Sequence, residues 1–280
     1  MPELPEVEVT RRGIAAPLLG ARVLAARLGK PLRWPLGRPV ESLAGGTLGA
    51  VVRRGKYLWL PLRHGSRAGA ADDGGLLLHL GMSGSLALLR EAPEAGPHDH
   101  FDLVTDRGTL RLNDPRRFGA VVWSASLQAA PASTLLQRLG AEPFDPALTP
   151  ALFHAALQRR RAPVKAVLLA GDVIVGAGNI YACEALFAAG IHPSTRADRI
   201  SRPRAARLLA ALRGTLGRAL EVGGSTLRDF TDAHGVSGEF QLEAAVYGRA
   251  GLACRQCGGS VRRVLQAQRS TYFCPSCQRR

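Results

Sequence analysis

Apolar and polar residues follow one another in short runs over the first half of the chain, and turn residues separate the runs. Short strands with frequent Gly, Pro and Asp between them are typical of a β-sandwich. The runs predict strands at 23–28, 48–53, 57–62, 76–82, 101–105, 109–112 and 120–123. A helix is expected before the first strand, because Pro5 suits a first helical turn and Leu4, Val7, Ile14 and Leu18 recur on one side.

From residue 150 to 222 the apolar period becomes helical. The positions expected to face a core are leucines, at Leu168, Leu186, Leu208, Leu212, Leu216 and Leu220. Before them, the Pro-Phe-Asp-Pro stretch at 143–146 predicts a linker. The pattern therefore indicates an α+β protein. It has a β-sandwich domain with a flanking helix at 1–130, a linker at 131–150, a helical domain at 151–240 and a cysteine-rich end at 241–280.

Four of the five cysteines lie close to the end of the chain, as Cys254-x2-Cys257 and Cys274-x2-Cys277. Two such pairs let two knuckles offer four thiolates to one tetrahedral Zn²⁺, so we expect a zinc ribbon with one structural zinc. The alternative is two structural disulfides, which a reducing compartment disfavours. Cys183 stands alone in an apolar stretch and is expected to be a small buried hydrophobe.

The charge balance points to a polyanionic partner. The chain of 280 residues carries 37 Lys and Arg against 22 Asp and Glu, which gives a net charge of +15, and its isoelectric point is about 10.9. Nucleic acid is the partner expected for so basic a protein. No apolar run approaches the roughly 18 residues of a membrane span, and the acidic start at 1–6 differs from a basic leader. We therefore expect a cytoplasmic protein.

The first residues suggest covalent chemistry. Removal of Met1 would leave Pro2 as a secondary amine beside Glu3, and such an amine forms an iminium with a sugar C1′ that keeps its charge without a proton. At neutral pH roughly a hundredfold more of an ordinary α-amine than of a lysine is unprotonated. The alternative, which composition alone favours, is that Pro2 serves only to permit removal of the methionine.

Motifs along the whole chain resemble those of the bacterial formamidopyrimidine-DNA glycosylases, which excise oxidised purines. The matching stretches are residues 2–8, 53–58, 79–84, 98–100, 114–119, 176–181 and 267–269. The resemblance implies a β-sandwich, a helix-two-turns-helix domain and a zinc ribbon. It also implies a monomer that acts on double-stranded DNA containing oxidised purines.

The catalytic roles come from this resemblance. Pro2 would attack C1′ of the damaged nucleotide, and Glu3 would protonate the sugar ring oxygen, so that the enzyme is both glycosylase and β,δ-elimination lyase. Lys56 would assist the chemistry and Arg269 the second elimination. A carboxylate acid needs a raised pKa, for which Glu6 or Glu8 could be the neighbour; exposed charges on a first helical turn are the alternative.

The DNA contacts also come from the resemblance. Met82, Arg116 and Phe118 match an intercalating trio that fills the gap left by the extruded nucleotide. The positions of His98, Arg160 and Asn179 match DNA contacts, Lys165 matches a residue beside the lesion, and residues 225–240 match a loop over the extruded base. His98 and His100 would share a strand face, which could suggest metal ligation, although no further ligand is obvious.

Two rival hypotheses remain at this point. A relative in the same superfamily removes oxidised pyrimidines, but usually lacks the combined trio. A non-enzymatic zinc-ribbon protein that binds nucleic acid would explain the charge and the cysteines, but not the N-terminus.

Overall fold

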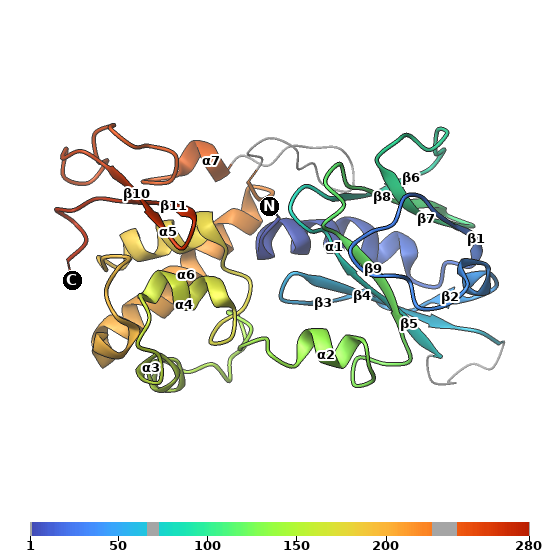
Figure 1. The fold of residues 1–280 in the computed structure, drawn as a ribbon, viewed down its shortest axis with the longest axis horizontal. Coiled ribbons are helices and arrows are strands. Elements are labelled where there is room, and N and C mark those ends of the chain that lie inside the picture. Colours follow the sequence, from blue (N-terminus) through green and yellow to red (C-terminus); the bar gives the residue numbers. More distant parts are fainter. Residues whose placement is uncertain (1, 66–72, 226–239, 280) are drawn as a thin grey trace. The chain divides into compact units, whose positions relative to one another are not determined.

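The computed structural model describes residues 2–65, 73–225 and 240–279. The chain forms two compact units (Figure 1). The first contains Met1–Gln137 and Gly223–Gly238, and the second contains Arg138–Val222 and Glu239–Arg280. Within the described ranges, none of the helices has both the length and the hydropathy needed to cross a bilayer.

The first unit is the predicted β-sandwich with a helix. One antiparallel sheet has the order β1 (Val23–Leu28), β7 (Asp99–Thr105), β8 (Gly108–Asn113) and β6 (Ser85–Leu89). The other has the order β2 (Thr47–Leu48), β4 (Tyr57–Arg63), β5 (Gly74–His79) and β9 (Ala120–Ser124), with β3 (Val52–Arg54) also paired to β4. Helix α1 spans Leu4–Leu18, as the apolar period predicted.

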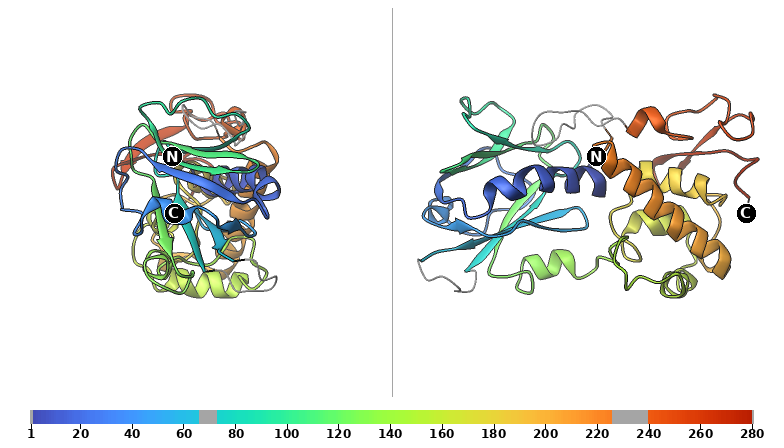
Figure 2. Two further views of the ribbon diagram at one scale, coloured as in Figure 1. Left: turned by 90° about the vertical axis from the view of Figure 1, so that its right-hand side faces the viewer. Right: turned by 180° about the vertical axis from the view of Figure 1, so that it is seen from behind.

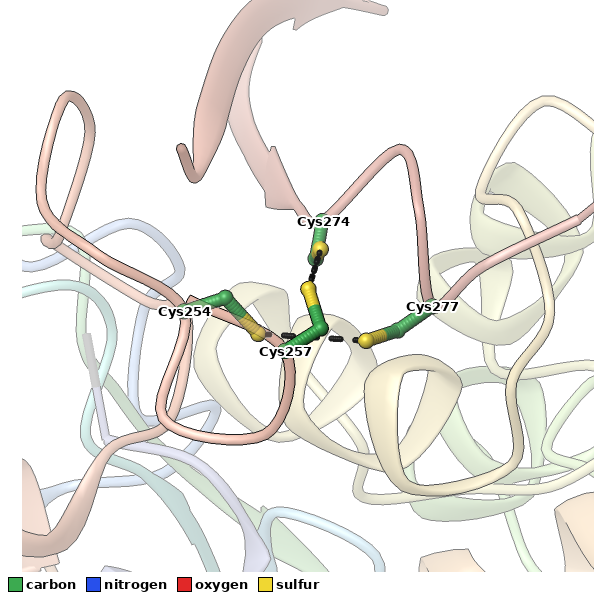
Figure 3. Close-up of side chains that lie close together, drawn as sticks. All are labelled: Cys254, Cys257, Cys274 and Cys277. Carbon is green, nitrogen blue, oxygen red and sulfur yellow. Dashed lines mark hydrogen bonds between the residues drawn. The ribbon is translucent and has the colours of Figure 1, made fainter. Parts of the chain in front are cut away.

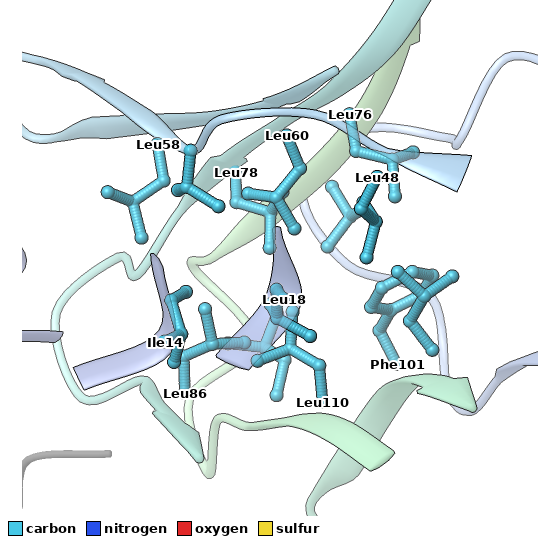
Figure 4. Packing of buried hydrophobic residues seen from close by; sticks show 14 of the residues in the cluster. Ile14, Leu18, Leu48, Leu58, Leu60, Leu76, Leu78, Leu86, Phe101 and Leu110 are labelled. Carbon is cyan, nitrogen blue, oxygen red and sulfur yellow. The ribbon is translucent and has the colours of Figure 1, made fainter. Parts of the chain in front are cut away.

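Leucines from both sheets and one side of α1 fill the core of this unit. Ile14 and Leu18 of α1 are fully buried, and Leu60 and Leu110 come from the two different sheets (Figure 4). Burial of each such side chain stabilises the fold by about 1.5–3 kcal/mol. The core therefore fixes α1, and with it the start of the chain, against the sandwich.

Two strand predictions were wrong in detail, and one strand was missed. The strand expected at 48–53 is split into β2 and β3. Pro61 of β4 lies opposite the break, and its carbonyl accepts a hydrogen bond from Gly49 N at 2.9 Å. Because proline has no N–H, the return hydrogen bond of the ladder cannot form there. The strand expected at 76–82 already ends at His79, since Gly81 turns the chain at φ +66°. Strand β6 was not predicted.

The second unit is mainly helical. Its helices are α3 (Pro150–Gln158), α4 (Val164–Ala170), α5 (Asn179–Ala188), α6 (Arg202–Glu221) and the single turn α7 (Phe240–Glu243). The long α6 packs against α5 (Figure 2). The six leucines expected in the core are buried, except Leu220, which is half-buried.

Segments outside these helices are also fixed in place. The short helix α2 (Ala132–Leu136) lies within the predicted linker, and the 3-10 turns η1 (Val40–Leu43) and η2 (Ala197–Arg199) follow β1 and precede α6. Arg213 of α6 donates to the carbonyl oxygens of Pro143, Asp145 and Leu148 at 2.6–3.1 Å. The end of the expected linker is thereby held on the second unit.

The C-terminal hairpin pairs β10 (Arg262–Gln266) with β11 (Arg269–Phe273). Cys183 of α5 is 1% exposed and packs in one cluster with Val246, Val261 and two of the C-terminal cysteines. The prediction that Cys183 is a buried small hydrophobe is confirmed.

Candidate functional site

The backbone next to Pro2 is held by two carboxylates at the start of α1. Glu3 is the N-cap residue, and Glu6 Oε2 accepts a hydrogen bond from its backbone N at 2.7 Å, while the Glu3 side chain accepts from the backbone of Glu6. Glu6 Oε1 also accepts from Ser225 N at 2.8 Å. Glu3 and Glu6 are each only 2% exposed, and Pro2 is buried. This capping box fixes the backbone beside Pro2 at the positive end of the helix dipole.

Glu8 has a different role from Glu6. It accepts hydrogen bonds from Arg11, Arg12 and Arg53 at 2.9–3.0 Å. Burial raises the pKa of Glu8, but these three guanidinium groups outweigh it and lower the pKa to about 2. Of the two neighbours considered for Glu3, therefore, Glu6 contacts its backbone and Glu8 belongs to an arginine cluster. Neither is an exposed charge.

Lys56 lies on the two-residue turn between β3 and β4. Gly55 has φ +59°, as the first position of a type II′ turn requires, and its carbonyl accepts from Arg53 Nη1 at 3.0 Å. The Lys56 side chain is half-buried. Its charge reaches His79, because Lys56 is one of the groups that lower the pKa of that imidazole.

The turns that carry Met82 and Phe118 touch each other through their backbones. A Cβ added at Gly81 would lie 2.4 Å from Gly119 N and 2.5 Å from the Phe118 carbonyl carbon. Only glycine permits this approach, and its positive φ makes the position doubly selective. Gly81 and Gly119, 38 positions apart in the sequence, are thus adjacent.

Asp114 holds both turns and is fully buried. Its Oδ1 accepts from Ser83 Oγ at 2.7 Å and from Arg116 N at 3.3 Å, and its Oδ2 accepts from Gly119 N at 2.7 Å. One carboxylate therefore ties the turn after Met82 to the loop that carries Arg116.

The tips of these turns face solvent. Phe118 is 44% exposed, Arg116 is exposed with its guanidinium carbon 5.0 Å from the Phe118 ring centre, and Met82 is half-buried. Arg117 between them has φ +55°, unusual for a residue with a side chain. An apolar ring and a cation on a loop held by a buried carboxylate are suited to insertion between bases.

His79 also belongs to this region, and no role for it was predicted from the sequence. Its Nδ1 accepts from Gly81 N at 2.9 Å, and its ring lies 4.7 Å from that of Tyr57. Burial, together with the charges of Lys56 and Arg33, lowers the pKa of His79 to about 4, against the opposing charge of Asp114. A neutral His79 can accept the Gly81 N–H and so fix the turn before Met82.

The two histidines at 98 and 100 differ in their surroundings. His98 is exposed just before β7, and its carbonyl accepts from Asp114 N at 2.9 Å. His100 is 2% exposed, at an irregularity in strand pairing between Asp99 and Phe101. Among the described residues, neither belongs to a cluster of three or more potential metal ligands, so a metal site at this pair is not supported.

In the second unit, Lys165 and Asn179 form one network with the C-terminal hairpin. Lys165 Nζ donates to Asn179 Oδ1 at 2.6 Å and to Thr271 Oγ1 at 2.7 Å. Asn179 Nδ2 donates to Ser270 O at 2.9 Å. Lys165 is 1% exposed. The first residue of α5 is thus bonded to β11 through a buried ammonium group.

Arg269 follows a strained turn. Ala267 and Gln268 have φ values of +49° and +57°, which a type I′ turn needs and which side chains other than Asn or Gly adopt at a cost. Arg269 is exposed at the start of β11. Arg160 of the same unit is half-buried and pairs with Asp172 at 2.7 Å.

Four sulfur atoms of the second unit meet the geometric needs of zinc. The Sγ atoms of Cys254, Cys257, Cys274 and Cys277 all lie within 4.8 Å of one another (Figure 3). Two of their separations are 3.9 and 3.5 Å, and four thiolates at about 2.3 Å from a tetrahedral zinc would lie roughly 3.8 Å apart. All five cysteines are free thiols, so the disulfide alternative is wrong and the cluster fits one structural zinc.

The predicted loop at 225–240 lies almost entirely outside the described residues. Only its two ends are described: Ser225, bonded to Glu6, and Phe240, whose ring lies 5.0 Å from that of Tyr181.

Comparison with known proteins accounts for the whole chain. Residues 1–121 match the formamidopyrimidine-DNA glycosylase N-terminal domain, 139–231 match the H2TH domain of the same enzymes, and 251–280 match a zinc finger found in FPG and IleRS. Formamidopyrimidine-DNA glycosylases from Variovorax paradoxus and from an Acidovorax species are 60% and 58% identical to the chain over 279 residues, covering all of each chain.

Solved structures agree with these matches. The MutM (FPG) protein of Thermus thermophilus is 39% identical with a TM-score of 0.87, over 99% of this chain and 98% of that one. A Lactococcus lactis FPG variant in complex with a Fapy-dG-containing DNA is 31% identical with a TM-score of 0.88, over the full length of both chains. The chain therefore belongs to the formamidopyrimidine-DNA glycosylase family.

Proposed function

We propose that this protein excises oxidised purines such as 8-oxoguanine and formamidopyrimidines from double-stranded DNA, and then cleaves the abasic site by β,δ-elimination. The observation that carries the proposal is the buried Pro2-Glu3 pair before α1, where the carboxylate of Glu6 holds the backbone of Glu3. A nucleophile must be held near its attack position, because small displacements cost large factors in rate.

In this proposal the Pro2 nitrogen attacks C1′ and the bond from C1′ to the base breaks. Glu3 gives a proton to the sugar ring oxygen, which opens the ring and leaves an iminium between Pro2 and C1′. The iminium draws electrons from the sugar as the 3′ and then the 5′ phosphate leave. Lys56 assists this chemistry, and Arg269 contacts the phosphates and assists the second elimination.

DNA contacts are assigned to both units. Met82 and Phe118 would enter the stack and Arg116 would pair with the orphaned base, which the contact between their turns supports. His98, Arg160 and Asn179 would contact the backbone, and Lys165 would lie by the lesion. Because Lys165 is buried against Asn179 and Thr271, its ammonium group would also orient Asn179. The zinc ion would hold the ribbon that presents Arg269.

The division into a catalytic domain at 1–130, a linker at 131–150, a helix-two-turns-helix domain at 151–240 and a zinc ribbon at 241–280 remains part of this proposal. So does action as a monomer in the cytoplasm. The relatives are bacterial enzymes, and the bacterial chromosome lies in that compartment. Sedimentation of the protein with and without a short duplex tests the stoichiometry.

Borohydride trapping tests the proposed nucleophile. The protein is incubated with a duplex containing 8-oxoguanine opposite cytosine, and peptide mapping should place the reduced adduct at Pro2. Pro2→Gly and a form with a blocked N-terminus should yield much less adduct. Adduct formation at Lys56, or full activity with a blocked N-terminus, would contradict the assignment.

Paired substitutions on α1 test the proposed acid. Glu3→Gln should slow excision at least about a hundredfold, as loss of a general acid does. Glu8→Gln makes the same chemical change one turn further along the chain and should slow excision less than about threefold, because Glu8 bonds Arg11, Arg12 and Arg53 and has no contact with Glu3 among these bonds. A duplex with an oxidised pyrimidine tests the remaining superfamily alternative, and faster excision from it would favour that alternative.

A further inference from the structure

One end of the five-stranded sheet gathers turns to which a role at the DNA is assigned above, and Arg33 lies at the same end. Tyr57 begins β4 opposite His79 at the end of β5, and His79 pairs with Ala120 at the start of β9. The turns before β4, after β5 and before β9 carry Lys56, Met82 and Phe118. The backbone and the charge of Arg33 both place it beside these turns.

A backbone hydrogen bond holds Arg33 against the loop at 114–119. Arg33 N donates to Gly119 O at 3.2 Å. Gly119 N in turn donates to Oδ2 of the buried Asp114 at 2.7 Å, so one residue of the loop bonds both the carboxylate and Arg33. The backbone of Arg33 is therefore fixed beside Phe118 before any DNA binds.

The Arg33 guanidinium group is exposed and has no carboxylate partner. Its carbon lies 4.7 Å from the Trp34 ring centre, and it forms no ion pair with any of the described acidic residues. Arg27 and Arg111 of the other sheet, by contrast, both pair with Asp102 at 2.8–2.9 Å. Stacking on an aromatic ring holds a guanidinium group in place without neutralising it. The charge of Arg33 thus remains available to an anion from outside the protein.

The pKa values of two neighbouring residues show where this charge acts. Burial raises the pKa of Tyr57, and the charge of Arg33 opposes the rise. Burial lowers the pKa of His79, and the charges of Lys56 and Arg33 lower it further. Coulomb forces weaken with distance, so both cations lie near this end of the sheet. The carboxylate that opposes them at His79 is that of Asp114, which already accepts hydrogen bonds from the turns. This end of the sheet is therefore suited to a phosphate group.

We propose that Arg33 binds a backbone phosphate of the duplex beside the base step that Met82 and Phe118 open, an inference that rests on the proposed function for the place of the DNA. The guanidinium group donates to two phosphate oxygens, which match its planar fork. A phosphate contact fixes the register of a protein on the duplex and carries no information about the bases. Because Arg33 is bonded to Gly119, the contact also fixes the depth at which the neighbouring loop enters the stack.

Fluorescence anisotropy of the full-length protein with a duplex containing an abasic-site analogue tests the proposal over a series of salt concentrations. Arg33→Gln should reduce the slope of log affinity against log salt by about 0.9 and weaken binding roughly fivefold to tenfold at about 0.1 M salt, as loss of one phosphate contact does. Arg33→Lys keeps the charge and should show less than about half of this effect. Arg90→Gln is the matched control, because Arg90 is an exposed arginine at the other end of β6 from the Met82 turn, and it should leave the slope unchanged.

Neutral methylphosphonate groups in the DNA locate the contact. One group replaces each phosphate around the analogue in turn, and at one position it should weaken binding of the wild-type protein but not of Arg33→Gln. The preference for cytosine over adenine opposite the analogue should be the same in both proteins, because a phosphate contact does not distinguish the bases.

Thermal unfolding separates the contact from folding. Arg33→Gln keeps the backbone bond to Gly119 and should unfold at the wild-type temperature; if it does not, Arg33→Met, which keeps an alkyl chain over Trp34, repeats the test. An unchanged salt slope in these variants, or a methylphosphonate series that weakens both proteins alike, would overturn the proposal. Excision of 8-oxoguanine is a separate readout: its absence in the wild-type protein would contradict the proposed function, while the salt slope still decides the role of Arg33.

Discussion

Asp114→Asn should loosen the turns that carry Met82 and Phe118 without changing the shape of the buried side chain. The carboxylate accepts from Ser83 Oγ and Gly119 N, both at 2.7 Å, and from Arg116 N at 3.3 Å. Asn has one acceptor oxygen, which can serve Gly119 N only if its amide nitrogen faces Ser83. The Ser83 hydroxyl can turn to accept, but Arg116 N then loses its acceptor.

The magnitude follows from these bonds. A hydrogen bond to a charged group contributes about 1.5–3 kcal/mol and a neutral one about half as much. Two short bonds would become neutral and one weak bond would be lost, so the free energy of unfolding should fall by about 2–3 kcal/mol. Since the change acts on the loop that is proposed to intercalate, affinity for a duplex with an abasic-site analogue should fall about tenfold.

Urea unfolding and fluorescence anisotropy measure the two effects. Asp106→Asn is the matched control, because Asp106 also accepts from a backbone N, that of Arg22 at 2.9 Å, but is exposed at the β7–β8 turn. Asp106→Asn should lower the free energy of unfolding by less than about 1 kcal/mol and leave DNA affinity unchanged. Two results would show that Asp114 does not position the loop. One is that Asp114→Asn lowers the free energy of unfolding no more than Asp106→Asn does. The other is that DNA affinity stays unchanged although the free energy of unfolding falls as expected.

Three further outcomes are expected. The pKa of His79 is about 4 in the folded protein, against roughly 6.5 in the unfolded chain. The unfolded chain therefore takes up the proton first as the pH falls, and up to about 3 kcal/mol of stability should be lost between roughly pH 6.5 and 4. His79→Asn keeps an acceptor for Gly81 N and should flatten this loss in urea unfolding at successive pH values. Complete removal of zinc by a strong chelator should abolish DNA binding and excision together, and retained affinity by anisotropy would contradict a structural metal. Arg116→Ala should reduce the preference for 8-oxoguanine opposite cytosine over adenine by about tenfold or more, while Arg117→Ala should change this ratio less, as measured by strand nicking.

The elements that the sequence predicted best are those whose pattern is local. Strand β1 has the expected bounds, and helix α1 runs from the first to the last apolar position expected on its buried side, because a glycine follows closely after each element. The break between β2 and β3 depends on Pro61 in a neighbouring strand, and no pattern within 48–53 records it. Strand β6 follows two glycines of a turn, and its burial does not alternate along the strand.

The candidate site could be predicted as a set of residues but not as a geometry. The cysteine spacing was sufficient for the zinc cluster, because two knuckles bring the ligands together locally. The contact between Gly81 and Gly119, and the bond from Ser225 to Glu6, join segments far apart in the sequence. Glycines in both turns were the only available signal for the first contact. The assigned roles of the individual residues stay predictions.

One device recurs at three places in the chain: a carboxylate accepts backbone N–H groups. Glu6 accepts from Glu3 and Ser225, Asp114 from Arg116 and Gly119, and Glu184 from three successive amides at 245–247 at 2.7–3.0 Å. Backbone amides carry no net charge, so a loop held in this way requires no lysine or arginine. Hydrogen bonds to charged acceptors also fix the loops more firmly than hydrogen bonds to neutral acceptors. The chain has 22 acidic residues and a net charge of +15, and this use of its carboxylates leaves lysines and arginines available for the DNA backbone.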